Sequence, residues 1–357
     1  MKNDTFTPKN TGNTLLMYRT EALDVFSVQV GKVRNRSTQN LLESGVLTKE
    51  QTLILKDGKL TFNIADYSNT IGLSVTQDQL MCYIQQKFTA QNSQEQVNYP
   101  ILIDVAEYQN LKQMKTTARS NFIRKMKQDI ELLSGVTIYD QTTTETGDAR
   151  FTGKYHFIST LFKEEIEKDK NNGIKVVNGQ VLVFVDPLYA KRMLENNTLT
   201  NYPQTLYLYR GTEPTAYNVG KKLAQRWQNP KNQLKGEQDI ISVKKLLQAA
   251  GLPSLEKLAK HNNQSKWKQM LLEPLEKALE RAVDIGLLNE WSFVKANKET
   301  LTDSELDRLE KGIDFNFFEK LYIHFDLNGE DVRPVAKKRL AAEKKTKKAP
   351  GKKSKKM

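Results

Sequence analysis

The stretch "KTTARSNFIRKMKQDIELLSGVTIYDQ", Lys115 to Gln141, joins a helical pattern directly to a strand pattern. The helical part ends at the Ser134-Gly135 stop, and "VTIYDQ" follows as a β-type run. Its apolar residues recur at helical spacing and form one stripe, made of Phe122, Ile123, Met126, Ile130 and Leu133. The opposite face is basic and polar, so this face is available for a contact other than core packing.

Two shorter helical patterns precede this stretch. They are "VTQDQLMCYIQQKF" from Val75 and "ILIDVAEYQNLKQM", in which Asp104 is placed to cap a helix. Two further β-type runs follow it, "KYHFISTLF" and "VLVFVDP". Three helices followed by a hairpin is the order of a winged helix, so we expect a first winged-helix domain over residues 75–200.

The same order recurs over residues 201–332. Helical patterns in "GTEPTAYNVGKKLAQRW", "DIISVKKLLQAAGLP" and "QSKWKQMLLEPLEKALERAVDIGLL" precede two β-type runs, "EWSFVK" and "FEKLYIHFDL". Pro274 should kink or divide the third helix. The predicted fold is therefore α+β, with two tandem winged-helix domains. The sequence leaves open whether residues 1–74, which contain the Asp-Gly hairpin signal "LILKDGKLTFNI", belong to the first domain.

The positive charge is concentrated at the C-terminal end of the chain. The net charge is +13, and residues 333–357 carry twelve Lys or Arg against one acid, Glu343, so about +2 is left for all other residues. Few apolar residues occur in 333–357, which we predict to be a disordered basic tail. A nucleic-acid site on the nearly neutral body must then be a local patch, with the tail supplying long-range attraction.

The exposed face of each third helix is the predicted DNA-binding site, because the third helix of a winged helix fits the major groove, about 12 Å wide. Lys, Arg, Ser and Thr side chains donate to phosphates, and Arg, Asn and Gln also read base edges. The first domain offers Thr117, Ser120, Asn121, Arg124, Lys125, Lys127 and Gln128, with Arg150 and Lys154 in the following hairpin as a candidate wing in the minor groove. The second offers Lys244, Lys245, Asn263, Gln264, Ser265, Lys266 and Lys268. A solvated helix face, or amides that only cap a helix, are the alternatives.

The sequence lacks the residue patterns that other classes of function require. Cys82 is the single cysteine, which excludes an intramolecular disulfide and a zinc site built on cysteines. The three histidines stand far apart without a His-x-His pair, and the spacing from Gly211 to Gly220 does not fit a phosphate loop. We therefore expect no enzyme, no cofactor and no metal. Since no apolar run reaches membrane-spanning length and no signal-peptide pattern is present, we expect a cytoplasmic protein.

The chain resembles the plasmid and phage replication initiators (Rep proteins) built from two winged-helix domains. The resemblance is carried by "LLSGVTIYDQ", by "VLVFVDPLYA" at the close of the long hairpin, and by "LLEPLEKALERAVDIGLLNEW". It implies binding to repeated sites at an origin of replication, recruitment of host replication proteins such as an initiator or helicase, and a homodimer that exchanges with a monomer. A winged-helix transcriptional regulator remains the alternative; a DNA-processing enzyme, relaxase or primase, has less support.

Overall fold

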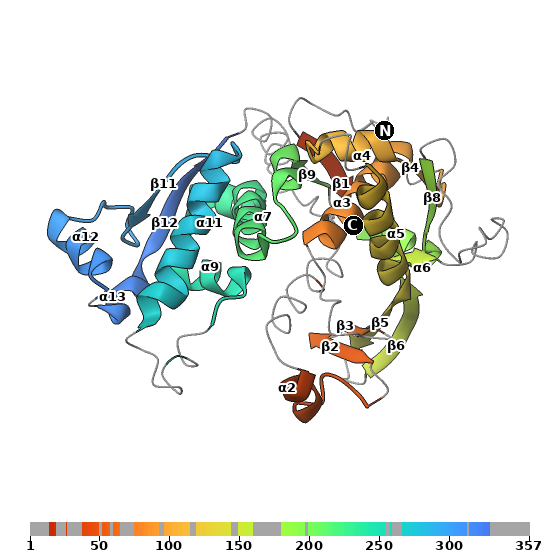
Figure 1. Ribbon diagram of the computed structural model, residues 1–357, viewed down its shortest axis with the longest axis horizontal. Coiled ribbons are helices and arrows are strands. Elements are labelled where there is room, and N and C mark those ends of the chain that lie inside the picture. The colour runs from red at the N-terminus through yellow and green to blue at the C-terminus, as the bar shows by residue number, and fades with distance from the viewer. Residues whose placement is uncertain are drawn as a thin grey trace, which may run out of the picture. The chain divides into compact units, whose positions relative to one another are not determined.

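The computed structural model describes residues 14–18, 26, 38–49, 52–57, 60–64, 75–92, 96–114, 119–143, 149–159, 180–196, 199–253, 258, 266–312 and 314–328. They form two compact units, which we call unit 1 (Leu15–Tyr217) and unit 2 (from Asn218). Figure 1 shows the elements of both units. The basic tail, 333–357, and its predicted disorder lie outside the described residues.

Three helices and a three-stranded antiparallel sheet form the centre of unit 1 (Figure 1). Their order along the chain is α3, β4, α4, α5, β7, β8, and the spatial strand order is β4-β8-β7, which is the topology of a winged helix. The predicted α+β class and helical order are confirmed. The bounds are α3 (Val75–Gln91), β4 (Pro100–Asp104), α4 (Val105–Leu111), α5 (Arg119–Gly135), β7 (Ile158–Ser159) and β8 (Gln180–Val185).

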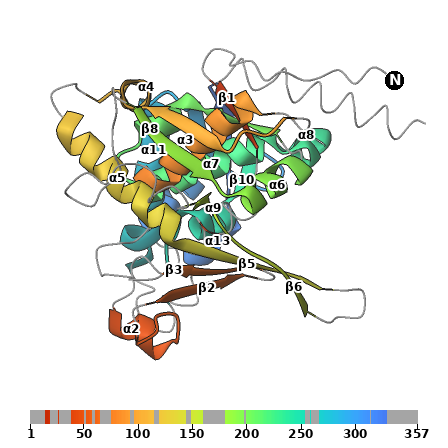
Figure 2. The same ribbon diagram turned by 90° about the vertical axis from the view of Figure 1, so that its right-hand side faces the viewer.

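The hairpin that directly follows α5 belongs to a second sheet. Strands β5 (Val136–Thr143) and β6 (Ala149–His156) extend from the end of α5 in Figure 2. They complete a four-stranded sheet of order β2-β3-β5-β6 with the predicted Asp-Gly hairpin, whose strands are β2 (Leu53–Asp57) and β3 (Leu60–Ile64). The β2–β3 hairpin of the N-terminal segment thus joins unit 1 through the pairing of β3 with β5, in which Phe62 lies opposite Ile138.

The remaining elements of unit 1 extend past the expected domain boundary at residue 200. Strand β9 (Leu199–Pro203) pairs with β1 (Thr14–Tyr18), and the short 3₁₀ helix η2 (Gln204–Leu208) packs on α3. The hydroxyl of buried Tyr207 donates to Gln86 Oε1 at 2.8 Å, which fixes η2 to the centre of unit 1. The division therefore lies at Tyr217/Asn218. Helices α2 (Thr38–Glu43) and α6 (Pro187–Asn196) complete unit 1.

Unit 2 repeats the winged-helix topology. Its three-stranded antiparallel sheet has the order β10-β12-β11, so β12 is central here, as β8 is in unit 1. The segment between β11 and β12 contains two helices, α12 and α13. The bounds are α7 (Pro214–Gln228), α8 (Pro230–Lys235), β10 (Ile240–Ser242), α9 (Val243–Ala250), η4 (Lys268–Leu272), α11 (Glu273–Asp284), β11 (Leu288–Val294), α12 (Asp303–Glu310), α13 (Phe315–Lys320) and β12 (Tyr322–Leu327).

The irregularity expected near Pro274 is a π-helical turn. In η4 the amide of Glu273 donates to the carbonyl of Lys268, five residues earlier, immediately before the proline that has no amide hydrogen to donate. The wider turn lets the helix continue, and Leu271, Leu275 and Leu279 all remain buried on one face. Together, η4 and α11 form the third helix of unit 2.

Candidate nucleic-acid interface

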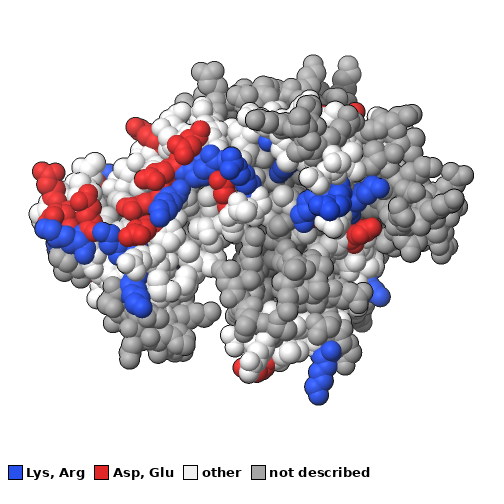
Figure 3. All heavy atoms as spheres, in the orientation of Figure 1, with Lys and Arg blue, Asp and Glu red and all other residues white. Residues whose placement is uncertain are grey.

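Helix α5 separates an apolar face from a polar, basic one. The side chains of Phe122, Met126 and Ile130 are buried, as the stripe in the sequence predicts. On the other side Ser120, Asn121, Arg124 and Gln128 are exposed, together with Glu131. The spacing of three and four residues places these side chains on one stripe. Figure 3 shows Lys and Arg side chains gathered over the part of unit 1 where α5 lies.

Arg124 occupies the middle of this exposed stripe. One terminal nitrogen of its guanidinium donates to Asn121 Oδ1 at 3.4 Å, a weak contact one helical turn earlier. Among the described residues Arg124 has no acidic partner, so its charge is available to a ligand. A guanidinium beside an amide on a helix face can form the paired hydrogen bonds by which proteins read guanine and adenine.

The two lysines on α5 have different surroundings. Lys125 Nζ lies 2.8 Å from Asp129 Oδ1, one turn later, and Asp129 is buried while Lys125 is half exposed. Lys127 is partly buried on the edge of the exposed stripe. Lys125 is thus the counter-ion of a buried carboxylate, a contact that the sequence already signals by the i, i+4 spacing of a lysine and an aspartate.

The predicted wing hairpin of unit 1 belongs to a different sheet from the strands of the winged helix. Lys154 pairs with Tyr139 in the β5–β6 ladder, several pairs away from the tip, whereas Arg150 pairs with Thr142 close to it. This hairpin joins the four-stranded sheet, whereas β4 shares its sheet with β8 and β7. The connection between β7 and β8, residues 160–179, lies outside the described residues, and Thr117 does too. Sequence alone does not distinguish two successive hairpins, because both consist of β-type runs.

Of the four predicted lysines of unit 2, two form contacts within the unit and two are exposed. Lys268 Nζ donates to the carbonyl of Glu310, and Lys268 packs against Gly312, so this side chain connects η4 to the end of α12. Lys244, on α9, forms an ion pair with Glu319 of α13 at 3.2 Å. Lys266, at the start of the third helix, is exposed, as is Lys245 on α9; Asn263, Gln264 and Ser265 lie outside the described residues.

The third helix of unit 2 becomes acidic beyond its first turn. Glu273, Glu276, Glu280 and Asp284 lie along α11 with Lys277 and Arg281, and Figure 3 shows the two signs of charge alternating there. Burial, and then the charge of Glu280, raise the pKa of Glu276. Close carboxylates on this surface repel phosphates, so only the start of the helix is suited to contact DNA.

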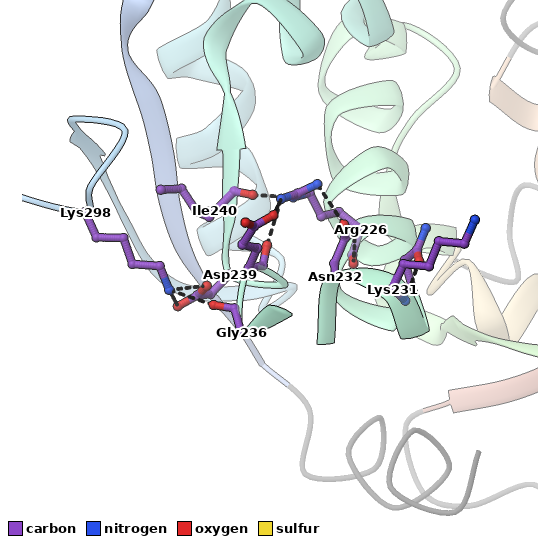
Figure 4. A network of polar contacts seen from close by, with 9 residues as sticks. Arg226, Lys231, Asn232, Gly236, Asp239, Ile240 and Lys298 are labelled. Atoms are coloured by element: carbon purple, nitrogen blue, oxygen red, sulfur yellow. Dashed lines mark hydrogen bonds and ion pairs between the residues drawn. The ribbon is translucent and has the colours of Figure 1, made fainter. Parts of the chain in front are cut away.

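Two basic side chains of unit 2 that are not among the predicted DNA-binding residues form contacts within the unit (Figure 4). Arg226, near the end of α7, donates to the carbonyls of Ile240 and Glu237, the latter at 2.8 Å. Lys298 Nζ lies 2.8 and 2.9 Å from the two carboxylate oxygens of Asp239. Both hold the segment that leads into β10, and a sequence pattern does not signal them because the partners are distant along the chain.

The histidines within the described residues make contacts that hold strands. His156 Nδ1 lies 2.9 Å from the carbonyl of Val136, and His324 Nε2 lies 3.3 Å from Asp239 Oδ2; His261 falls outside. In the described part of the chain, no group of three His, Cys, Asp or Glu residues could hold a metal ion. No helix among the described residues is both long and apolar enough to cross a membrane.

Comparisons with known proteins give a fold-level similarity only. The chain matches no protein-family model and no curated protein. It is similar to the crystal structure of Pi initiator protein in complex with iteron DNA, with 12% sequence identity, 90% of this chain and 100% of that chain covered, and a TM-score of 0.42. It is also similar to a structure of domains 2 and 3 of RctB, with 8% identity, 85% and 100% of the two chains covered, and a TM-score of 0.40.

Proposed function

We propose that this chain is a sequence-specific double-stranded DNA-binding protein that initiates plasmid or phage replication at repeated origin sites. The observation that carries the DNA-binding part is the exposed stripe of α5, with Arg124 and Asn121 at its centre. It combines a guanidinium that has no acidic partner among the described residues with amide and hydroxyl side chains on the third helix of a winged helix, the element that enters the major groove.

Charge supports a division of roles along the chain. The described surface of α5 carries a local basic patch, while most of the net charge lies in residues 333–357. Phosphate attraction by lysines is strong and independent of sequence, whereas hydrogen bonds from a rigid helix discriminate between bases. The tail would therefore raise affinity for every duplex, and α5 would select among them.

The initiator part of the proposal is supported by the repeated topology. Two units with the same order of helices and strands each present a third helix, and the resemblance to Rep proteins rests on the segments around both. Within this proposal, host replication proteins are recruited after origin binding, and dimers exchange with monomers. No catalytic step, cofactor or metal is part of the proposal.

The test has two stages. The full-length protein is first mixed with duplexes of randomised sequence, and bound duplexes are amplified and sequenced; enrichment of a common site is expected, and its absence would end the proposal. A plasmid without an origin is then supplied with the DNA flanking the gene. Replication that depends on this protein supports an initiator. Binding to the flanking DNA without replication would instead identify a transcriptional regulator.

A further inference from the structure

The four-stranded sheet of unit 1 has one buried and one outward face. Its strands β2, β3, β5 and β6 lie side by side in Figure 2. Their register places one buried row across the sheet, made of Leu55, Phe62, Ile138 and Tyr155. Because side chains alternate between the two faces of a sheet, the neighbouring positions point away from this core. We call the surface that they form the outer sheet face.

The outer sheet face is basic and polar. One row runs in register across all four strands and consists of Lys56, Thr61, Tyr139 and Lys154. The row beside it consists of Ile54, Asn63, Thr137 and His156. None of these eight residues is acidic. The one acid of β5, Asp140, is buried and forms an ion pair with Arg192 at 3.3 Å. The face therefore attracts anions.

The two lysines stand at opposite edges of this face. Lys56 lies on β2 and Lys154 on β6, which are the two outer strands, and both side chains are exposed. Neither lysine has an acidic partner among the described residues. Three steps of about 4.8 Å between neighbouring strands separate them by roughly 14 Å. Between them, Thr61 and Tyr139 are partly exposed and carry hydroxyl groups, which can donate to phosphate oxygens.

The sheet is fixed to the winged helix of unit 1. Strand β5 begins at the residue that directly follows α5. The amide of His156, at the end of β6, donates at 3.1 Å to Asp186 Oδ2, and Asp186 directly follows β8. The ion pair of Arg192 with Asp140 joins α6 to β5. The outer sheet face therefore has a fixed position relative to the recognition helix.

We propose that the outer sheet face binds the phosphate backbone of duplex DNA beside the segment that α5 reads, with Lys56 and Lys154 as its charged contacts. This inference rests on the proposed function, because α5 has to hold the duplex. It adds Lys56 to the DNA-binding residues and gives Lys154 a phosphate contact in place of the expected contact in the minor groove. Phosphates are alike along a duplex, so this contact raises affinity without selecting a sequence.

Duplex DNA fits this face better than a single strand does. Proteins bind single strands through exposed aromatic side chains, on which successive bases stack. Tyr139 is the only Phe, Tyr or Trp in the two rows, and it is partly buried. Lysines at the two edges with hydroxyl groups between them provide charge and hydrogen-bond donors for phosphates, but they do not provide a stacking surface.

The experiment measures how the affinity of the full-length chain depends on salt. The probes are the duplex enriched from the randomised pool and a scrambled duplex of equal base composition. Loss of one phosphate contact flattens the slope of log affinity against log salt concentration by about 0.9. Lys56→Gln/Lys154→Gln should therefore flatten the slope by about 1.8 on both duplexes, so the advantage of wild type shrinks about tenfold between about 50 and 200 mM salt.

The matched control is Lys277→Gln/Lys320→Gln, which removes the same charge from two exposed lysines of unit 2 outside the predicted DNA-binding residues. This control should keep the wild-type slope. Lys56→Arg keeps the charge and should keep the slope as well. If the double variant of the sheet does not fold, as judged by circular dichroism, Lys56→Gln alone should flatten the slope by about 0.9. A wild-type slope in the folded sheet variant would overturn the inference.

Two other outcomes would assign the lysines a different role. Loss of affinity for an unpaired strand, with the duplex slope unchanged, would make the face a single-strand site and overturn the inference. Lysines on edge strands also prevent the association of sheets. Light scattering that shows aggregation of the sheet variant, together with an unchanged slope, would assign them that role instead. The proposed function fails separately, when the wild-type chain enriches no duplex at all.

Discussion

Replacement of Lys112 by Met should change how the stability of unit 1 depends on pH. The pKa of Lys112 falls from 10.5 to about 8 on folding, mainly through burial. Between these two values the unfolded chain binds more protons than the folded one, so stability rises with pH across this window. At about 1.4 kcal/mol for each pKa unit, the lysine destabilises the fold by about 3 kcal/mol below pH 8, and about 2 kcal/mol of this is regained between pH 7.5 and 9.5.

The buried tyrosines limit the useful range on the alkaline side. Burial raises the pKa values of Tyr108, Tyr202, Tyr207 and Tyr217 above the ordinary value of 10.0. These groups keep their protons in the folded state, so they stabilise the fold below pH 10 and this stabilisation is lost as the unfolded chain ionises above it. The comparison therefore belongs between pH 7.5 and 9.5, below the ordinary pKa of tyrosine.

The assay is urea unfolding of wild type and Lys112→Met at three pH values, followed by near-ultraviolet circular dichroism of tyrosine. Tryptophan fluorescence serves as an internal control, because the three tryptophans of the chain, Trp227, Trp267 and Trp291, all belong to unit 2. Wild-type unit 1 should gain stability over this range and the variant should not, with the tryptophan transition equal in both. If the unfolding free energy from the tyrosine signal changed with pH equally in wild type and Lys112→Met, the claim that burial of Lys112 destabilises unit 1 would be refuted.

Three further predictions concern the tail and unit 2. Removal of residues 333–357 should weaken binding to all duplexes and flatten its salt dependence, since this segment carries about +11 charges; an unchanged salt slope would exclude it from DNA. Lys298→Met should lower the free energy of unfolding of unit 2 by about 1 kcal/mol through loss of the Asp239 contacts, without changing DNA affinity; reduced affinity would instead make Lys298 a phosphate contact. Thr302→Ala should cost about 1 kcal/mol of unit 2 stability in urea unfolding, because Thr302 caps α12, and an unchanged midpoint would contradict this.

Local sequence patterns predicted the helices well because the residues that form and end a helix are close together in the sequence. The stripe of Phe122, Met126 and Ile130 is buried, and Asp104 caps α4 by accepting from the amide of Glu107 at 2.9 Å. Gly251, which ends α9 with a left-handed backbone, is a stop that the residue type itself signals. In each case the signal and the structure lie within a few residues of each other.

Strand pairing and side-chain partners were not predictable in the same way. Whether β3 joins β5, through Phe62 and Ile138, depends on residues far apart in sequence, and so does the choice between two hairpins as the wing. The partner of Lys268 is the backbone carbonyl of Glu310 at the end of α12, and because every residue has a backbone carbonyl, no residue type in the sequence signals this contact. Only the i, i+4 spacing from Lys125 signals the buried Asp129, because a basic face does not indicate an acid on the opposite side of the helix.

The central claim, that α5 reads bases in the major groove, is tested most directly by methylation protection of guanine N7 on the enriched duplex. Wild-type protein and Arg124→Ala are compared at concentrations that give equal occupancy. Wild type should protect guanines in one major-groove segment, and the variant should lose protection at one guanine there while its affinity falls by about 1–3 kcal/mol on this duplex and much less on the scrambled one. An identical protection pattern with Arg124→Ala would contradict the assignment of α5 as the recognition helix.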